Sequence, residues 1–313
     1  MFRISLLALL SLGSCASSPA VAPYDASAAT RDGFELVRLE DGAQIAYRRR
    51  GAGAPLLVAA GSLLGPDLEA LAAGRELVLF DAVGQGRSSP VLDLDRVRFE
   101  RDVRDLEALR AHLGLERVSL LGWSYQAAVA ARYALQYPQH VDKLVLVGPL
   151  PLRRDPFWVR FGANVVRRLD DEGTARIASL REEGLDRRSP EQFCDEFVAV
   201  FFAAYVVDPT VLQSMRGEPC PAPNNEPDFS AQVAALRLEK LGNWDWRHLL
   251  ARLKTPTLLV HGAEAPVPVE SAEEWAAILP DARLLVVPES GHMPWLERPD
   301  LFFDPVAEFL AED

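Results

Sequence analysis

The stretch LLGWSYQAA, residues 120–128, decides how this chain folds and where its chemistry lies. An apolar run typical of a strand ends here, a tight turn around Ser124 follows, and a run of small residues typical of a helix begins. Such a strand–turn–helix unit exposes the serine hydroxyl beside the positive N-terminus of the helix. A serine that only caps the helix is the alternative. The apolar run that follows at 141–147 favours a nucleophile.

Further apolar runs lie on both sides of this unit. A β-hairpin is predicted at 34–40 and 43–49, where Asp41-Gly42 supplies the turn. Buried strands are predicted at 56–60, 77–80, 118–121, 144–147, 258–260 and 284–287, and helices at 97–113, 125–137, 272–279 and 301–310. Buried strands that alternate with helices predict an α/β fold, with a mostly parallel sheet and helices on both faces.

The interval 151–250 interrupts this alternation. It contains helical stretches at 191–205 and 229–240 and a proline-rich break at 219–227. We therefore predict a helical cap at 151–250, inserted between a first core part at 34–150 and a second core part at 251–313. Four phenylalanines at helical spacing predict a cap core, with pocket lining as the alternative: Phe193, Phe197, Phe201 and Phe202.

The N-terminus has the features of an export signal. A basic start and an apolar core too short to span a bilayer predict a signal peptide at 1–14. The following LGSC, residues 12–15, resembles the lipobox of bacterial lipoproteins, which predicts that Cys15 is acylated. Residues 15–33 then form a lipid-anchored tether. We expect an exported protein, anchored to a bacterial cell membrane; a plain secretory peptide is the alternative.

Composition excludes several classes of function. The 313 residues include 33 basic and 45 acidic side chains, for a net charge of −12, so no basic face for nucleic acid is expected. Three cysteines and five histidines lack the spacing of a metal site, and Gly84-Gln85-Gly86 lacks the context of a cofactor loop. We expect no cofactor and no metal. Cys194 and Cys220 are free to pair in an exported chain, but sequence does not show whether they do.

From residue 34 to 311 the chain resembles the α/β-hydrolase fold superfamily. Three segments besides the Ser124 turn carry the resemblance: FDAVGQGRS at 80–88, NWDW at 243–246 ahead of LLVHG at 258–262, and ESGHMPWLERP at 289–299. The nearest group is the cap-bearing esterases and proline iminopeptidases. The resemblance implies a serine hydrolase that cleaves a small ester, amide or peptide substrate through an acyl-enzyme.

The resemblance also implies residue roles. Ser124 is the nucleophile and His292 the base, which with an ordinary imidazole makes activity rise through neutral pH. Glu264 is the expected acid, because the family order is nucleophile, acid, histidine and because 266–268 restrict its turn. Asp155, after the strand ending at 147, is the alternative acid. The amides of Tyr125 and Ser62 are expected to form the oxyanion hole.

Three departures from the family pattern bear on this site. Ala265 stands where the family has its aspartate, Ala60-Gly61 stands for the usual His-Gly, and Gln126 replaces a glycine of the serine turn. A bulky Gln126 must turn its side chain aside or widen the packing. Two other functions therefore stay open. One is a proline-iminopeptidase-like enzyme that uses cap carboxylates (Glu191, Asp195, Glu196 or Glu226), and the other is a catalytically silent binding lipoprotein.

Overall fold

The computed structural model describes residues 26–30, 33–91, 93–221, 224 and 227–312. The predicted signal peptide at 1–14, Cys15 and most of the tether lie outside this part. The described chain begins with a four-residue helix, α2 (Ala26–Ala29), ahead of the sheet.

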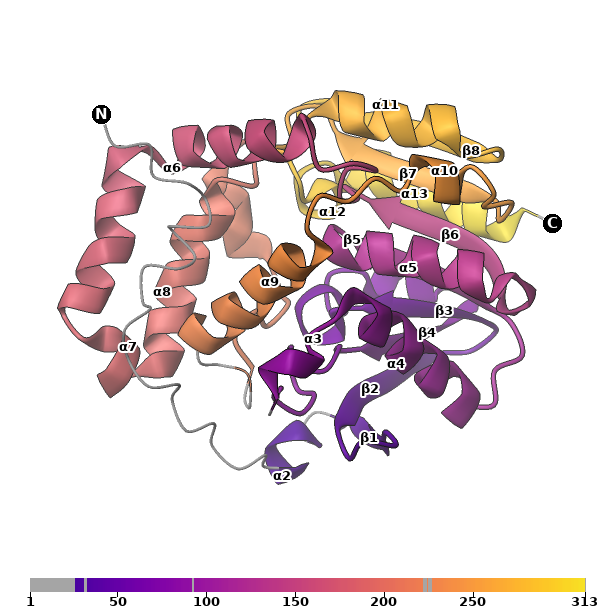
Figure 1. The fold of residues 1–313 in the computed structure, drawn as a ribbon, viewed down its shortest axis with the longest axis horizontal. Helices are drawn as coiled ribbons and strands as arrows, with labels where there is room; N and C mark the ends of the chain where they lie inside the picture. The colour runs from indigo at the N-terminus through magenta and orange to yellow at the C-terminus, as the bar shows by residue number, and fades with distance from the viewer. Residues whose placement is uncertain (1–25, 31–32, 92, 222–223, 225–226, 313) are drawn as a thin grey trace.

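Eight strands form one sheet in the order β1-β2-β4-β3-β5-β6-β7-β8 (Figure 1). The first two form the predicted antiparallel hairpin, and β2 also pairs antiparallel with β4. All other neighbours are parallel. The strands are β1 (Glu35–Arg38), β2 (Gln44–Gly51), β3 (Ala54–Ala59), β4 (Arg75–Phe80), β5 (Val118–Trp123), β6 (Val141–Val147), β7 (Thr257–Gly262) and β8 (Ala282–Val287).

Helices cover both faces of the sheet, because successive strand residues point to opposite sides. Leu57, Val78 and Leu120 belong to one buried cluster, whereas their neighbours Leu56 and Leu121 belong to the other. The first cluster is covered by α4 (Phe99–His112), α5 (Tyr125–Gln136), α10 (Arg247–Leu250) and α11 (Val269–Ile278). The second is covered by α3 (Gly61–Leu64), α12 (Pro294–Glu297) and α13 (Pro299–Ala311).

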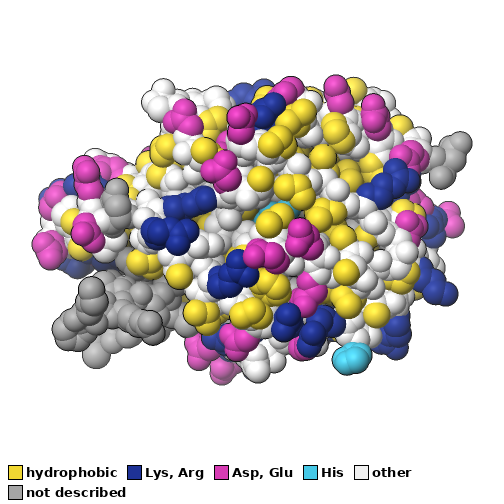
Figure 2. All heavy atoms as spheres, turned by 90° about the horizontal axis from the view of Figure 1, so that it is seen from above, with side chains coloured by type: hydrophobic (Ala, Val, Ile, Leu, Met, Phe, Trp, Pro, Cys, Tyr) yellow, Lys and Arg dark blue, Asp and Glu magenta, His cyan; other side chains and the backbone are white. Residues whose placement is uncertain are grey.

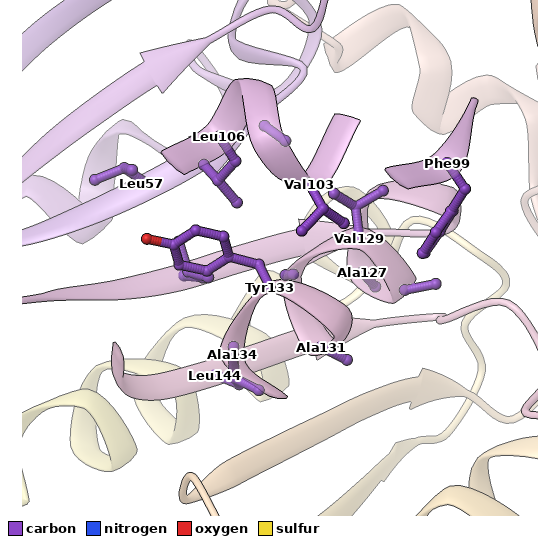
Figure 3. Packing of buried hydrophobic residues seen from close by; sticks show 14 of the residues in the cluster. Leu57, Phe99, Val103, Leu106, Ala127, Val129, Ala131, Tyr133, Ala134 and Leu144 are labelled. Atoms are coloured by element: carbon purple, nitrogen blue, oxygen red, sulfur yellow. The ribbon is translucent and has the colours of Figure 1, made fainter. Parts of the chain in front are cut away.

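Helix α5 approaches the sheet closely because its inward residues are small. Figure 3 shows Ala127, Ala131 and Ala134 of α5 among the larger side chains of the same cluster. A Cβ at Gly122 would lie 2.6 Å from the Cα of Ala127, so β5 and α5 meet backbone to backbone at the start of the helix. This contact fixes the turn that contains Ser124.

The segment between β6 and β7 is mostly helical and lies to one side of the sheet (Figure 1). It contains α6 (Phe157–Glu182), α7 (Leu185–Arg188), α8 (Pro190–Ala203) and α9 (Pro227–Leu241) before α10. A disulfide joins Cys194 of α8 to Cys220 in the loop before α9, with the two Cα atoms 6.0 Å apart. The chain thus has the α/β-hydrolase fold with an inserted helical cap.

The surface is mixed in charge. Acidic and basic side chains alternate over the face that Figure 2 shows, with scattered apolar side chains between them. Among the helices that the structure describes, none has both the length and the apolar character needed to cross a bilayer.

Candidate active site

Ser124 occupies the turn between β5 and α5 in a conformation that few non-glycine residues adopt. Its φ is 55° and its ψ is −118°, which stores backbone strain. The turn is held on both sides: the Ser124 amide donates to the Val147 carbonyl over 2.9 Å, and the Ser124 carbonyl accepts from the Leu150 amide over 3.3 Å. The predicted nucleophile is therefore presented on a rigid turn, half-buried, at the C-terminal edge of the sheet.

A cavity of about 340 Å³ lies between this turn and the cap. Ser124, Trp123 and Tyr125 contribute to the core side. The opposite wall is aromatic and comes from α8 and its C-terminal end: Phe197, Phe201 and Phe202. Phe193 is fully buried in the predicted cap core. Phe197 and Phe201 also pack against buried clusters of the cap, so for them the cap core and the alternative of pocket lining both hold. Phe202 packs against the core of the sheet and not against a cap cluster. One face of α8 thus supplies both cap packing and cavity wall.

Gln126, the residue that departs from the family at the serine turn, does not widen the packing. Its side chain turns aside to line the cavity, where its amide nitrogen donates to Oε1 of Gln85 over 3.0 Å. The close backbone contact is made by Gly122 and Ala127, as described above, so it needs no glycine at 126. The departure changes the cavity wall and leaves the turn intact.

A buried ion pair closes one side of the cavity. Arg237 of α9 contacts Asp102 of α4 with an Nε–Oδ2 distance of 3.2 Å, and both side chains are 5% exposed. The Tyr125 hydroxyl donates to the same carboxylate over 2.7 Å. The cap is therefore held against the core beside the nucleophile, at the cost of burying two charges that must remain paired.

His292 lies next to the serine turn but does not line the cavity. It is 2% exposed, and its ring centre lies 5.2 Å from that of Trp123 and 5.1 Å from that of Tyr205. No hydrogen bond joins it to Ser124 in the described part of the chain; such contacts are often loose in the absence of substrate. Burial, together with the neighbouring His261 and Arg168, lowers the pKa of His292 to about 3. The imidazole is therefore neutral at ordinary pH, the state a general base requires.

Neither predicted acid reaches His292. Glu264 is exposed, and its backbone binds Ser290 and Arg168, while its carboxylate makes no hydrogen bond to any residue that the structure describes. Asp155 is exposed at the entrance to the cap. His292 Nδ1, the atom that an orienting carboxylate binds, is buried without a partner among the described residues. The structure therefore corrects the expectation of a three-membered site: it brings the predicted base beside the nucleophile's turn but brings no acid to the base.

Of the two amides expected to form an oxyanion hole, only one is available in the structure. Tyr125 is the first residue of α5, so its amide has no partner within the helix. The Ser62 amide, in contrast, donates to Oδ1 of Asp81 over 3.0 Å, and the Ser62 hydroxyl donates to Oδ2 over 2.5 Å. Asp81 occupies this amide, which contradicts the role predicted for Ser62 in this state of the protein. Asp81 is the second residue of the FDAVGQGRS segment and directly follows β4, and the motif alone indicates no such contact with Ser62.

We predict that Glu264→Gln and Asp155→Asn each leave turnover of an activated ester within a few-fold of wild type, because neither carboxylate binds His292. Steady-state assays at equal folded fraction check this. A loss approaching about 10⁴-fold in either variant, the scale of removing the orienting acid from a triad, would show that this carboxylate reaches His292 during turnover.

Comparison with known proteins agrees with this architecture. The model of the α/β hydrolase fold family matches residues 60–177. A proline iminopeptidase from Heyndrickxia coagulans is 26% identical over 277 residues, covering 84% of this chain and 93% of the relative. A 2-hydroxy-6-oxo-6-phenylhexa-2,4-dienoate hydrolase from Burkholderia cepacia is 27% identical over 242 residues, covering 77% and 79%.

Among solved structures, a thermophilic esterase from Thermogutta terrifontis superposes with a TM-score of 0.64 at 21% identity, covering 88% of this chain and 97% of that chain. At this identity the likeness concerns the fold alone, whereas the sequence relatives are hydrolases. The chain is therefore an enzyme of the α/β-hydrolase fold, as the family match and the hydrolase relatives indicate.

Proposed function

We propose that this protein is a serine hydrolase that cleaves carboxylic esters with an apolar acyl group through an acyl-enzyme. The observation that supports this most is the strained Ser124, held at the wall of a cavity whose opposite side is aromatic, with a neutral, buried His292 beside it. A hydroxyl in this position becomes a nucleophile when a neighbouring base accepts its proton.

The proposed reaction uses these groups in two steps. Ser124 Oγ bonds to the acyl carbon as His292 accepts the hydroxyl proton, and the Tyr125 amide stabilises the negative charge on the carbonyl oxygen. His292 then returns the proton to the departing alkoxide, which leaves as the alcohol. In the second step water attacks the acyl-enzyme and gives a proton to His292. The acid departs, and Ser124 regains its proton.

The cavity favours an ester over a peptide with a free amino terminus. Binding such a terminus calls for an unpaired carboxylate in the cap. Glu191, Asp195 and Glu196 do not line the cavity, and Glu196 pairs with Arg176. Glu226 lies outside the described residues. Glu218 does line the cavity, but it binds Arg87 over 2.6 Å. Because one sequence relative is a proline iminopeptidase, amide cleavage is the second candidate activity.

We predict that a fluorophosphonate probe labels Ser124 and that Ser124→Ala abolishes both labelling and ester turnover by several orders of magnitude. Mass spectrometry of the labelled peptide checks the site, and Ser214→Ala serves as the control that labels normally. Hydrolysis of p-nitrophenyl esters should exceed that of prolyl arylamides. A folded wild-type protein that no probe labels would instead support the silent binding lipoprotein.

We predict that kcat/KM for an ester stays flat between about pH 5 and 8. A base acts in its neutral form, and the lowered pKa of His292, about 3, keeps it neutral throughout this range. An ordinary imidazole, with a pKa of about 6.5, would make kcat/KM fall roughly tenfold per pH unit below that value. Circular dichroism at each pH confirms folding. A fall centred near 6.5 would contradict a buried, neutral base.

We also propose that the protein is exported and anchored to a membrane by acylation of Cys15. The support is the LGSC pattern and the tether behind it. Since the several acyl chains of a lipoprotein anchor stably, Cys15→Ala should move the protein from the membrane to the soluble fraction, whereas Ser17→Ala should not. Wild-type protein found wholly soluble and cut at another position would contradict this.

A further inference from the structure

The loop that carries His292 is fixed through its backbone. The His292 amide donates to the Tyr205 carbonyl over 2.6 Å, and Trp123 Nε1 donates to the His292 carbonyl over 2.9 Å. Tyr205 follows α8 in the cap, whereas Trp123 ends β5 in the core. His292 is thus held between cap and core by main-chain contacts, while its Nδ1 has no partner among the described residues.

A single carboxylate joins the cap to this loop. Glu297, the last residue of α12, accepts from the Val207 amide over 2.6 Å with Oε1 and from the Gly291 amide over 2.7 Å with Oε2. The Ser290 hydroxyl lies 3.3 Å from Oε2. Val207 is two residues after Tyr205, and Gly291 immediately precedes His292. The carboxylate therefore ties together the two segments that meet at the His292 amide.

These segments pack too closely to shift independently. A Cβ at Gly291 would lie 2.2 Å from the Tyr205 carbonyl oxygen and 2.9 Å from the Cα of Val206. The imidazole itself lies against the backbone of Gly148, where a Cβ would lie 2.7 Å from Nδ1. The backbone of Gly148 thus limits the space of the ring, and the carboxylate of Glu297 binds the Gly291 amide of the segment that carries His292.

The electrostatic surroundings support a role beyond packing. Burial raises the pKa of Glu297, and the amides of Val207 and Gly291 oppose that rise. Arg168 of α6, the cation near His292, also faces Glu297 and Glu264. Arg168 therefore interacts electrostatically both with His292 and with the carboxylate of Glu297.

We infer that Glu297 is the positioning carboxylate of His292, acting through the Gly291 and Val207 amides instead of through the imidazole Nδ1. It does not touch substrate or Ser124. In this arrangement the cap segment 205–207 helps to position His292. The cap therefore lines the cavity and also determines where the imidazole lies. The inference rests on the proposed function only in the part of its test that measures ester turnover.

The test is Glu297→Gln, which keeps the shape of the side chain but replaces one acceptor oxygen by a donor that faces an amide. A displaced base slows the chemical step without changing substrate binding. We therefore expect kcat for an ester to fall about 10-fold to 100-fold, the scale of a displacement near 1 Å, with KM unchanged. The rate of fluorophosphonate labelling should fall in parallel. Glu297→Asp, which retains the charge, should lose less and provides a second variant if the first does not fold.

The matched control is Glu270→Gln, which breaks another cap–core contact, the 2.7 Å pair of Glu270 with Arg160, away from the His292 loop. It should leave kcat and KM within about twofold. Unchanged kcat in Glu297→Gln, or a change confined to KM, would overturn the inference.

A second readout separates this inference from the proposed function. NMR titration of His292 needs no activity, so it applies even to a wild-type protein that no probe labels. In wild type the imidazole should stay neutral down to low pH. In Glu297→Gln a displaced ring regains contact with water, which should move its pKa toward the ordinary value of about 6.5. Identical titration of the two proteins would overturn the inference, whether or not the enzyme is active.

Discussion

The close contact between β5 and α5 is the constraint on which the rest of the structure depends. Because Gly122 and Ala127 meet backbone to backbone, the intervening turn has too little length for ordinary conformations, and Ser124 is forced to a positive φ. That conformation places the hydroxyl at the sheet edge and leaves the Tyr125 amide free at the helix start. The hydrogen bonds to Val147 and Leu150 then fix the turn to the neighbouring strand. Nucleophile and oxyanion donor are thus consequences of one packing contact.

Burial gives His292 the neutral state a base needs, but it also makes the charged state costly. An orienting carboxylate usually compensates by stabilising the imidazolium that forms during the reaction. Here no carboxylate contacts the ring, and Arg168 opposes the charge. The site therefore keeps the imidazole neutral and disfavours its protonated form. In the proposed reaction, formation of the imidazolium is therefore the step that this site stabilises least.

The sheet was predictable from sequence because strands buried on both faces read as continuous apolar runs. Each of the six predicted buried runs overlaps a strand. The site was predictable only where local sequence determines geometry, as at the Ser124 turn. Glu264 follows β7 as expected, but whether its carboxylate faces His292 depends on tertiary contacts with Ser290 and Arg168. Likewise, the Ser62 amide donates to the carboxylate of Asp81, which directly follows β4 and lies 19 residues further along the chain.

The cap provides the remaining specificity, and its parts are coupled. Helix α8 places three phenylalanines on the cavity wall, and its C-terminal end continues into Tyr205, whose carbonyl and ring contact His292. The disulfide joins the same helix to the loop that brings Glu218 and Pro219 to the cavity. A substrate that pushes against the aromatic wall therefore acts on the element that holds the base. In the proposed reaction, an acyl group that fills the cavity without displacing α8 leaves His292 in its place. The shape of the acyl group should therefore affect kcat as well as KM.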